Sequence, residues 1–151
     1  MLGLLMVGGC EATQRAAPGA ISTAAPAGAA ATEKESLRMW MTVGDRRFAV
    51  TLSDNATARS FAALLPLTID MSDLNDNEKH AKLPRALAAD ASKPGTIRSG
   101  DIMLWGTDTL VVFYLTFDSA YSYTRIGRVD DPAGLAQALG PRDARITFSK
   151  S

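Results

Sequence analysis

The chain has 151 residues and balances 16 Lys and Arg against 16 Asp and Glu, so it lacks the basic excess of a nucleic-acid-binding protein and we expect no nucleic-acid partner. No stretch approaches the about 18 consecutive apolar residues that a membrane-spanning helix needs. The single cysteine allows no internal disulfide, and no Cys/His cluster has zinc spacing, so we expect neither a metal nor a cofactor.

The N-terminus carries a motif that bears on where in the cell the protein is located. Cys10 ends the segment Val7-Gly8-Gly9-Cys10, straight after a short apolar run. The segment resembles the lipobox of bacterial lipoproteins, in which signal peptidase cuts before the cysteine and the cysteine carries the lipid. The resemblance implies a lipoprotein-type signal over residues 1–10, a membrane anchor through lipid on Cys10, and a domain at the cell envelope that faces the periplasm or the exterior.

This signal is incomplete, because no Lys or Arg precedes the apolar run that starts at Met1. Either translation begins further upstream, or the segment is a cytoplasmic tail with an incidental cysteine. Residues 11–36 are rich in Ala, contain Pro18 and Pro26, and offer little apolar surface to bury. We therefore expect a disordered tether over residues 11–36 and a folded domain over residues 37–151.

The first part of the folded domain predicts a hairpin, a helix and a strand. Apolar residues alternate over 39–43 and over 48–52, on either side of a Gly44-Asp45 turn. Asp54 or Asn55 can cap a helix that runs to about Leu65 and is ended by Pro66. Alternation returns over 67–71, which predicts a third strand.

Residues 72–99 show no regular pattern. They contain the polar run 73–80 and the turn residues Lys93-Pro94-Gly95. Loops of this length are uncommon inside compact domains and are often functional, so we expect this segment to form the rim of a site.

The C-terminal half predicts further strands and a second helix. A strand over 102–105 leads through a hairpin loop at 106–108 into residues 109–117, which are apolar on both faces and should be covered on both sides. A strand over 121–129 precedes a helix with Asp131 as its cap, Pro132 in its first position and Gly140-Pro141 at its end. Residues 145–148 form the last strand.

The count of about seven or eight short strands with two short helices favours a closed barrel or a sandwich. The order of the motifs at 67–71, 77–79, 100–105, 110–114 and 123–127 is similar to that in the bacterial cyclophilin-like domain family. The resemblance covers residues 38–150 and implies a mainly β fold, a small closed cyclophilin-like β-barrel with two short helices. The chain lacks the Gly-Gly-Asp-type segment of true cyclophilins, so no catalytic residue is transferred from them.

One candidate site lies in the polar run. His80 is the sole histidine and lies near Glu78, but a general base needs an orienting partner and a pocket, and a solvated loop histidine is the simpler interpretation. The carboxylates Asp70, Asp73, Asp76 and Glu78 lack the spacing of a calcium loop, so a hydrophilic loop explains them better.

The second candidate group is aromatic. Trp105, Tyr114, Tyr121 and Tyr123 fall on neighbouring predicted strands or their connection, together with Arg125. Aromatic walls with one cation are typical of a peptide or small-molecule pocket, although such residues also fill cores. The candidate ligand-binding residues are Glu78, His80, Trp105, Tyr114, Tyr123 and Arg125.

Two functions remain open at this point. The first is a membrane-tethered domain of unassigned activity that binds a peptide or a small ligand. The alternative is a divergent peptidyl-prolyl isomerase that acts on exported proteins, in which Arg125 would donate to the prolyl nitrogen while an apolar cup holds the ring. The sequence identifies no catalytic residue.

Overall fold

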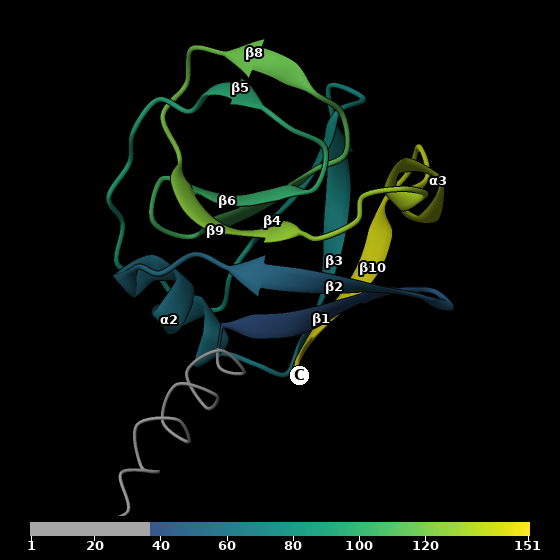
Figure 1. Ribbon diagram of the computed structural model, residues 1–151, viewed down its shortest axis with the longest axis horizontal. Coiled ribbons are helices and arrows are strands. Elements are labelled where there is room, and N and C mark those ends of the chain that lie inside the picture. Colours follow the sequence, from purple (N-terminus) through teal and green to yellow (C-terminus); the bar gives the residue numbers. More distant parts are fainter. Residues whose placement is uncertain (1–36) are drawn as a thin grey trace, which may run out of the picture.

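The predicted closed barrel is confirmed in the computed structural model, which describes residues 37–151 (Figure 1). The predicted signal, the tether and Cys10 lie outside the described residues. The barrel strands are β1 (Arg38–Val43), β2 (Arg46–Leu52), β3 (Leu67–Leu74), β4 (Glu78–Lys82), β6 (Asp101–Trp105), β7 (Thr109–Phe113), β9 (Thr124–Val129) and β10 (Ala144–Lys150). Around the barrel their order is β1-β10-β3-β4-β7-β6-β9-β2, and all neighbours are antiparallel.

The predicted first hairpin is confirmed. Val43 pairs with Arg46 across the turn, where Gly44 has a φ of 59° that suits glycine. Because side chains alternate between the faces of a strand, Met39, Met41 and Val43 of β1 point into the barrel, as do Phe48, Val50 and Leu52 of β2. The core that they form with the other strands contains Met39, Met41, Phe48, Val50, Met71, Ile102, Leu104, Leu110, Val112, Ile126, Ile146 and Phe148.

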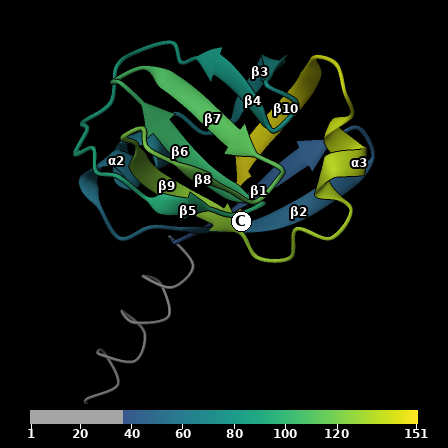
Figure 2. The same ribbon diagram turned by 90° about the horizontal axis from the view of Figure 1, so that it is seen from above.

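Two helices pack on this core at opposite ends of the barrel (Figures 1 and 2). The cap predicted for α2 (Ala56–Ala62) is confirmed, since the Asn55 side chain accepts from the Ala58 amide at 2.7 Å. Phe61 of this helix is fully buried and meets Phe148 edge to face, with 5.4 Å between ring centroids. Among the helices of residues 37–151, none has the length and apolar character to cross a membrane.

The second helix, α3 (Leu135–Leu139), is shorter than predicted. Its N-cap is Gly134, not Asp131, and Pro132 lies before the helix. The Asp131 carboxylate accepts from the Ala133 amide at 3.1 Å, which closes a local turn. Gly134 then adopts a φ of 78°, and the helix begins only after it.

The expectation of an irregular segment over residues 72–99 is wrong for its first part. Strand β3 continues to Leu74, and β4 returns from Glu78 after a turn in which Asn75 and Asp76 have φ of 57° and 56°. Two consecutive positive φ angles are typical of the tight turns that suit the twist of hairpins. The interior-facing position of β4 is occupied by Lys79, so the strand shows no apolar alternation.

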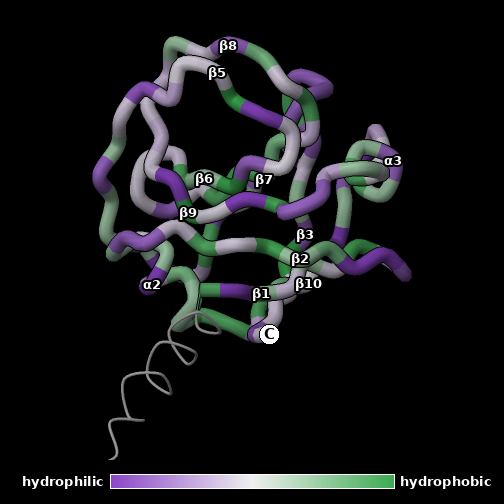
Figure 3. The backbone as a smooth tube through the Cα atoms, in the orientation of Figure 1, coloured by the Kyte–Doolittle hydropathy of each residue, from purple (hydrophilic) through white to green (hydrophobic). Residues whose placement is uncertain are grey.

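The expectation that residues 109–117 are covered on both sides is confirmed for β7. Leu110 and Val112 face the barrel core, whereas Val111 and Phe113 belong to a second cluster outside the barrel. A small sheet of β5 (Gly95–Ile97) and β8 (Phe117–Ser119) covers that outer cluster. Figure 3 shows the hydrophobic residues along β6 and β7, between the barrel interior and this sheet.

The predicted strands over 109–117 and 121–129 are each shorter in the structure. Strand β7 ends at Phe113 and β9 begins at Thr124. The chain leaves the barrel between them to form β8 and then returns. This excursion creates the covered outer face on which the candidate site lies.

Candidate functional site: a cavity on the outer wall of the barrel

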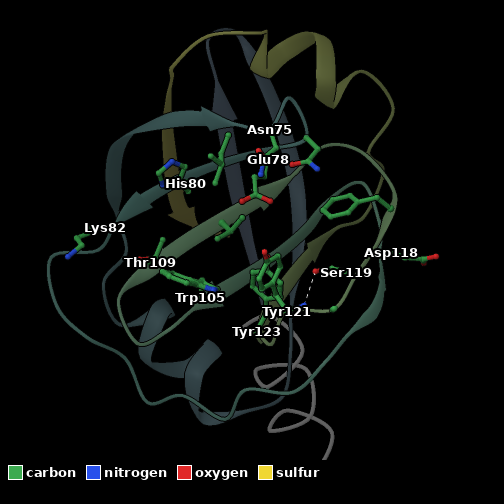
Figure 4. A pocket seen from close by; sticks show the side chains of 15 residues that line it. Asn75, Glu78, His80, Lys82, Trp105, Thr109, Asp118, Ser119, Tyr121 and Tyr123 are labelled. Carbon is green, nitrogen blue, oxygen red and sulfur yellow. Dashed lines mark hydrogen bonds between the residues drawn. The ribbon is translucent and has the colours of Figure 1, made fainter.

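A cavity of about 620 Å³ opens on the outer face of the barrel, between strand β4 and the segment from Phe117 to Tyr123 (Figure 4). Val111 of β7 lines the cavity, and Trp105 and Thr109 lie at one end of it. A volume of this size is within the range of about 300–1,000 Å³ that holds small-molecule ligands.

The register of the strands explains which side chains reach the cavity. Glu78, His80 and Lys82 alternate along β4, so they share its outer face. They pair with Phe113, Val111 and Thr109 of β7, and Val111 and Thr109 pair in turn with Met103 and Trp105 of β6. The outward-facing side chains of β4, β7 and β6 therefore lie side by side and form one continuous surface.

Glu78 lies in the most buried polar position of this surface. The residue is only 7% exposed, and its carboxyl group makes no hydrogen bond or ion pair with any of residues 37–151. Burial and the charge of Asp73 raise the pKa of Glu78 above its ordinary value. Figure 4 shows the Glu78 carboxyl group directed toward the centre of the cavity.

Aromatic side chains form the facing wall and the mouth. Tyr123 is buried and meets Phe113 edge to face, with 5.5 Å between ring centroids. Burial and the charge of Glu78 raise the pKa of the Tyr123 hydroxyl, so this group stays protonated. Trp105 and Tyr121 are 54% and 70% exposed at the mouth, an exposure that core aromatics do not have.

Of the six residues that the sequence analysis selected, the structure brings four together at the cavity: Glu78, His80, Trp105 and Tyr123. His80 is a half-buried residue of β4, so its interpretation as a solvated loop histidine is wrong. The hydrophilic-loop interpretation of the carboxylates is also wrong for Asp70 and Asp73, which lie on β3, and for Glu78, which lies on β4. Residues 37–151 contain no group of at least three His, Cys, Asp or Glu that could hold a metal ion.

Tyr114 lies elsewhere, at the end of the β3–β4 hairpin. Its hydroxyl donates to Asp73 Oδ1 at 2.5 Å, and its ring centroid is 5.2 Å from the Lys79 ammonium. Burial and the Asp73 carboxylate raise the pKa of Tyr114 well above its ordinary value. This residue belongs to an internal polar network.

Arg125 also lies outside the large cavity. Its Nη1 atom is 3.7 Å from Asp101 Oδ2, and it lines a smaller cavity of about 280 Å³ beside Asn55 and Thr57. The bulge between β6 and β9 sets this position, because Met103 pairs with Arg125 after the register shifts.

The sequence analysis missed several residues of the cavity. Lys82 could have been found from its spacing to Glu78 and His80 once β4 was recognised. Phe117, Asp118 and Ser119 of β8 carry no such signal, because the pairing of β8 with β5 joins positions that are 20 or more residues apart in sequence.

Eight antiparallel strands closed into a barrel, with a helix at each end, define a cyclophilin-like barrel. The chain belongs to the Cyclophilin-like family, whose model matches residues 41–149. It is also similar to the solution structure of a hypothetical protein from Archaeoglobus fulgidus, with 14% identity, a TM-score of 0.50, and coverage of 76% of this chain and 95% of that chain. At this identity the likeness shows the fold alone, and no curated protein matches the sequence.

Proposed function

We propose that this domain binds a peptide or a small molecule in the outer-wall cavity while lipid on Cys10 tethers it to a membrane of the cell envelope. The observation that carries the binding proposal is Glu78, a buried carboxyl group without a partner that faces an aromatic-walled cavity of about 620 Å³. Concave, mostly apolar sites with one or two polar groups are the usual form of a ligand pocket.

The energetic argument supports this use of Glu78. A buried polar group left without a hydrogen bond costs about 1–3 kcal/mol, and a charged group costs more. Glu78 makes no hydrogen bond with the surrounding residues Val111, Phe117 and Tyr123. The Glu78 carboxyl oxygens stay open to the cavity, so a ligand that donates hydrogen bonds can reach them.

The geometry favours binding over prolyl isomerisation. The isomerase hypothesis used Arg125 as the donor to the prolyl nitrogen, but Arg125 faces Asp101 outside the cavity. No arginine lines the large cavity among residues 37–151. The basic side chains that line it are His80 and Lys82, and the Lys82 side chain is 80% exposed.

The binding proposal is tested by amide chemical shifts of the full chain, with phenethyl alcohol and a blocked peptide containing Phe and Pro as probes. Saturable shifts should centre on residues 78–82 and 121–123, and Trp105→Ala and Tyr121→Ala should weaken them. Leu115→Ala is the matched control, because Leu115 is 47% exposed and lies outside the cavity. Absence of saturable shifts, or shifts centred elsewhere, contradicts the proposal.

The same peptide tests the isomerase alternative through cis–trans exchange. Exchange that is no faster with the protein than without it supports a binding domain. Exchange that is catalysed and is lost in His80→Gln or Lys82→Met would replace the binding proposal by an isomerase.

The tether is tested by labelling cells with a palmitate analogue. The wild-type chain should be labelled and recovered with membranes, whereas Cys10→Ser should be neither. Equal labelling of both chains contradicts the anchor and favours the cytoplasmic alternative.

A further inference from the structure

The inner end of the cavity has hydrogen-bond acceptors that accept no hydrogen bond from residues 37–151. The Glu78 carboxyl group has no partner within residues 37–151. The adjacent residue Asn77 also lines the cavity, and its Oδ1 atom is buried without a hydrogen bond in the described part of the chain. A ligand group that donates hydrogen bonds is therefore the complement of this end.

The cations of β4 do not neutralise Glu78. Lys79 faces the opposite side of the strand, where its ammonium donates to Asp73 Oδ1 at 2.8 Å, to the Gly140 carbonyl at 2.7 Å and to the Arg142 carbonyl at 2.6 Å. Lys82 shares the face of Glu78 but lies four residues along the strand, at a distance of roughly 13 Å. Its ammonium is 3.8 Å from Asp108 Oδ2 at the far end.

Tyr123, whose hydroxyl interacts electrostatically with Glu78, suits a cation as well. Tyr123 lies on the facing wall, and Trp105 and Tyr121 are exposed at the mouth. A cation over the face of a Tyr ring is attracted by the ring electrons, and more strongly when it is removed from water. Charge-assisted hydrogen bonds to a carboxylate are roughly twice as strong as neutral ones.

We infer that the ligand carries a protonated amine or a guanidinium on an apolar body, with the cation at the Glu78 carboxylate and the apolar part between Tyr123, Val111 and Trp105. This inference rests on the proposed binding function and specifies its ligand chemistry. A free aromatic or aliphatic amine and a Lys or Arg side chain of a peptide share this chemistry.

The test uses three probes with a common phenyl body and different charge: phenethylamine, phenethyl alcohol and phenylacetate. Their dissociation constants are measured at neutral pH by amide chemical shifts of the full chain, for the wild type, Glu78→Gln and Asp70→Asn. Asp70→Asn is the matched control, because it removes the same charge from an exposed residue outside the cavity.

We expect phenethylamine to bind the wild type about 10-fold more tightly than phenethyl alcohol, and phenylacetate to bind most weakly. Glu78→Gln should abolish the preference for the amine and leave the alcohol within about 2-fold, whereas Asp70→Asn should retain the preference. Equal or tighter binding of the alcohol or the acid, or an amine preference that survives Glu78→Gln, overturns this inference and leaves the binding function standing. Failure of all three probes to bind overturns both.

A second pair of probes separates the two sources of the cation. Blocked peptides Ala-Lys-Phe-Ala and Ala-norleucine-Phe-Ala differ only in the ammonium group. Tighter binding of the lysine peptide than of phenethylamine, with loss of that binding in Glu78→Gln, supports a peptide side chain as the source. Binding of phenethylamine without binding of either peptide supports a small amine.

Discussion

Glu78 and Lys79 are consecutive residues of β4 whose side chains lie on opposite sides of the barrel wall and differ in their hydrogen bonding. The Lys79 ammonium is fully buried and satisfied by three acceptors, whereas the Glu78 carboxyl is buried without a partner in the described chain. Buried charges are normally paired, because removal from water is costly. Lys79 therefore joins β4 to the segment around Gly140 and Arg142, whereas the Glu78 carboxyl is directed into the cavity.

The stability of the empty domain should reveal the unpaired state of Glu78. Its pKa is raised by burial and by Asp73, so the folded state binds its proton more tightly than the unfolded state. The resulting stabilisation is complete below the unfolded pKa of 4.5 and is lost as pH rises through the higher folded pKa. We therefore expect Glu78→Gln to raise the free energy of unfolding by about 1–2 kcal/mol at alkaline pH.

This advantage of Glu78→Gln should shrink toward zero as the pH falls toward 4.5. Urea unfolding of both chains across this pH range measures it, and Asp70→Asn gives the effect of removing a charge from an exposed site. A constant difference between Glu78→Gln and the wild type at all pH values would show that the carboxyl is not titrating as the structure implies.

Lys79 should be among the most sensitive positions of the barrel. Lys79→Met removes the donor to Asp73 and to the Gly140 and Arg142 carbonyls, which leaves a partly buried carboxylate without its main partner. We expect a loss of about 3–5 kcal/mol in the free energy of unfolding. Lys82→Met on the same strand should cost no more than about 0.5 kcal/mol, because the side chain is 80% exposed.

The burial of Lys79 also explains why one strand of the barrel could not be predicted from the sequence. Alternating apolar side chains located β1 and β2, and continuous apolar runs between turns located β6 and β7. Strand β4 puts Lys79 inward, and two of its partners lie 61 and 63 residues further along the chain. A buried lysine becomes plausible only when those carbonyls are known to be near, which one strand's pattern cannot show.

The candidate site was predictable to a similar extent and for related reasons. Trp105 and Tyr123 could be selected as aromatics near strand ends, and Glu78 and His80 as an acid beside the single histidine. Tyr114 and Arg125 were grouped with them by residue type, but their positions depend on where β7 ends and on the β6–β9 bulge. Both features are set by long-range pairing.

Tyr114→Phe should lower the stability of the domain without affecting binding in the cavity, because Tyr114 contacts Asp73 and does not line the cavity. Burial acts to raise the pKa of Asp73, but the hydrogen bonds from Lys79 and Tyr114 outweigh it, so the pKa of Asp73 is lowered below its usual 3.8. Asp73 therefore stabilises the fold above pH 3.8, and this stability is lost as pH falls through its lower folded pKa. Loss of the Tyr114 hydroxyl should cost about 1–2 kcal/mol at neutral pH and weaken the acid dependence.

The same variant should leave the binding of phenethylamine within about 2-fold of the wild type, because Tyr114 lies outside the cavity. Urea unfolding and the amide-shift titration measure the two quantities on one sample. A large loss of binding with unchanged stability would place Tyr114 in the site after all.

Gly127 should be intolerant of any side chain, because β9 approaches β2 too closely there. A Cβ atom on Gly127 would lie 2.7 Å from the Thr51 carbonyl oxygen and 3.2 Å from Leu52 Cα, and both are backbone atoms that cannot move aside without breaking the strand pairing. We expect Gly127→Ala to cost about 2–3 kcal/mol, which is the upper part of the range for overpacking. Gly44→Asn is the control, because Gly44 has open space around it and Asn tolerates its positive φ. Since β2 and β9 form one of the contacts that close the barrel, a Gly127→Ala chain as stable as the wild type would mean that the two strands are further apart than in the structure.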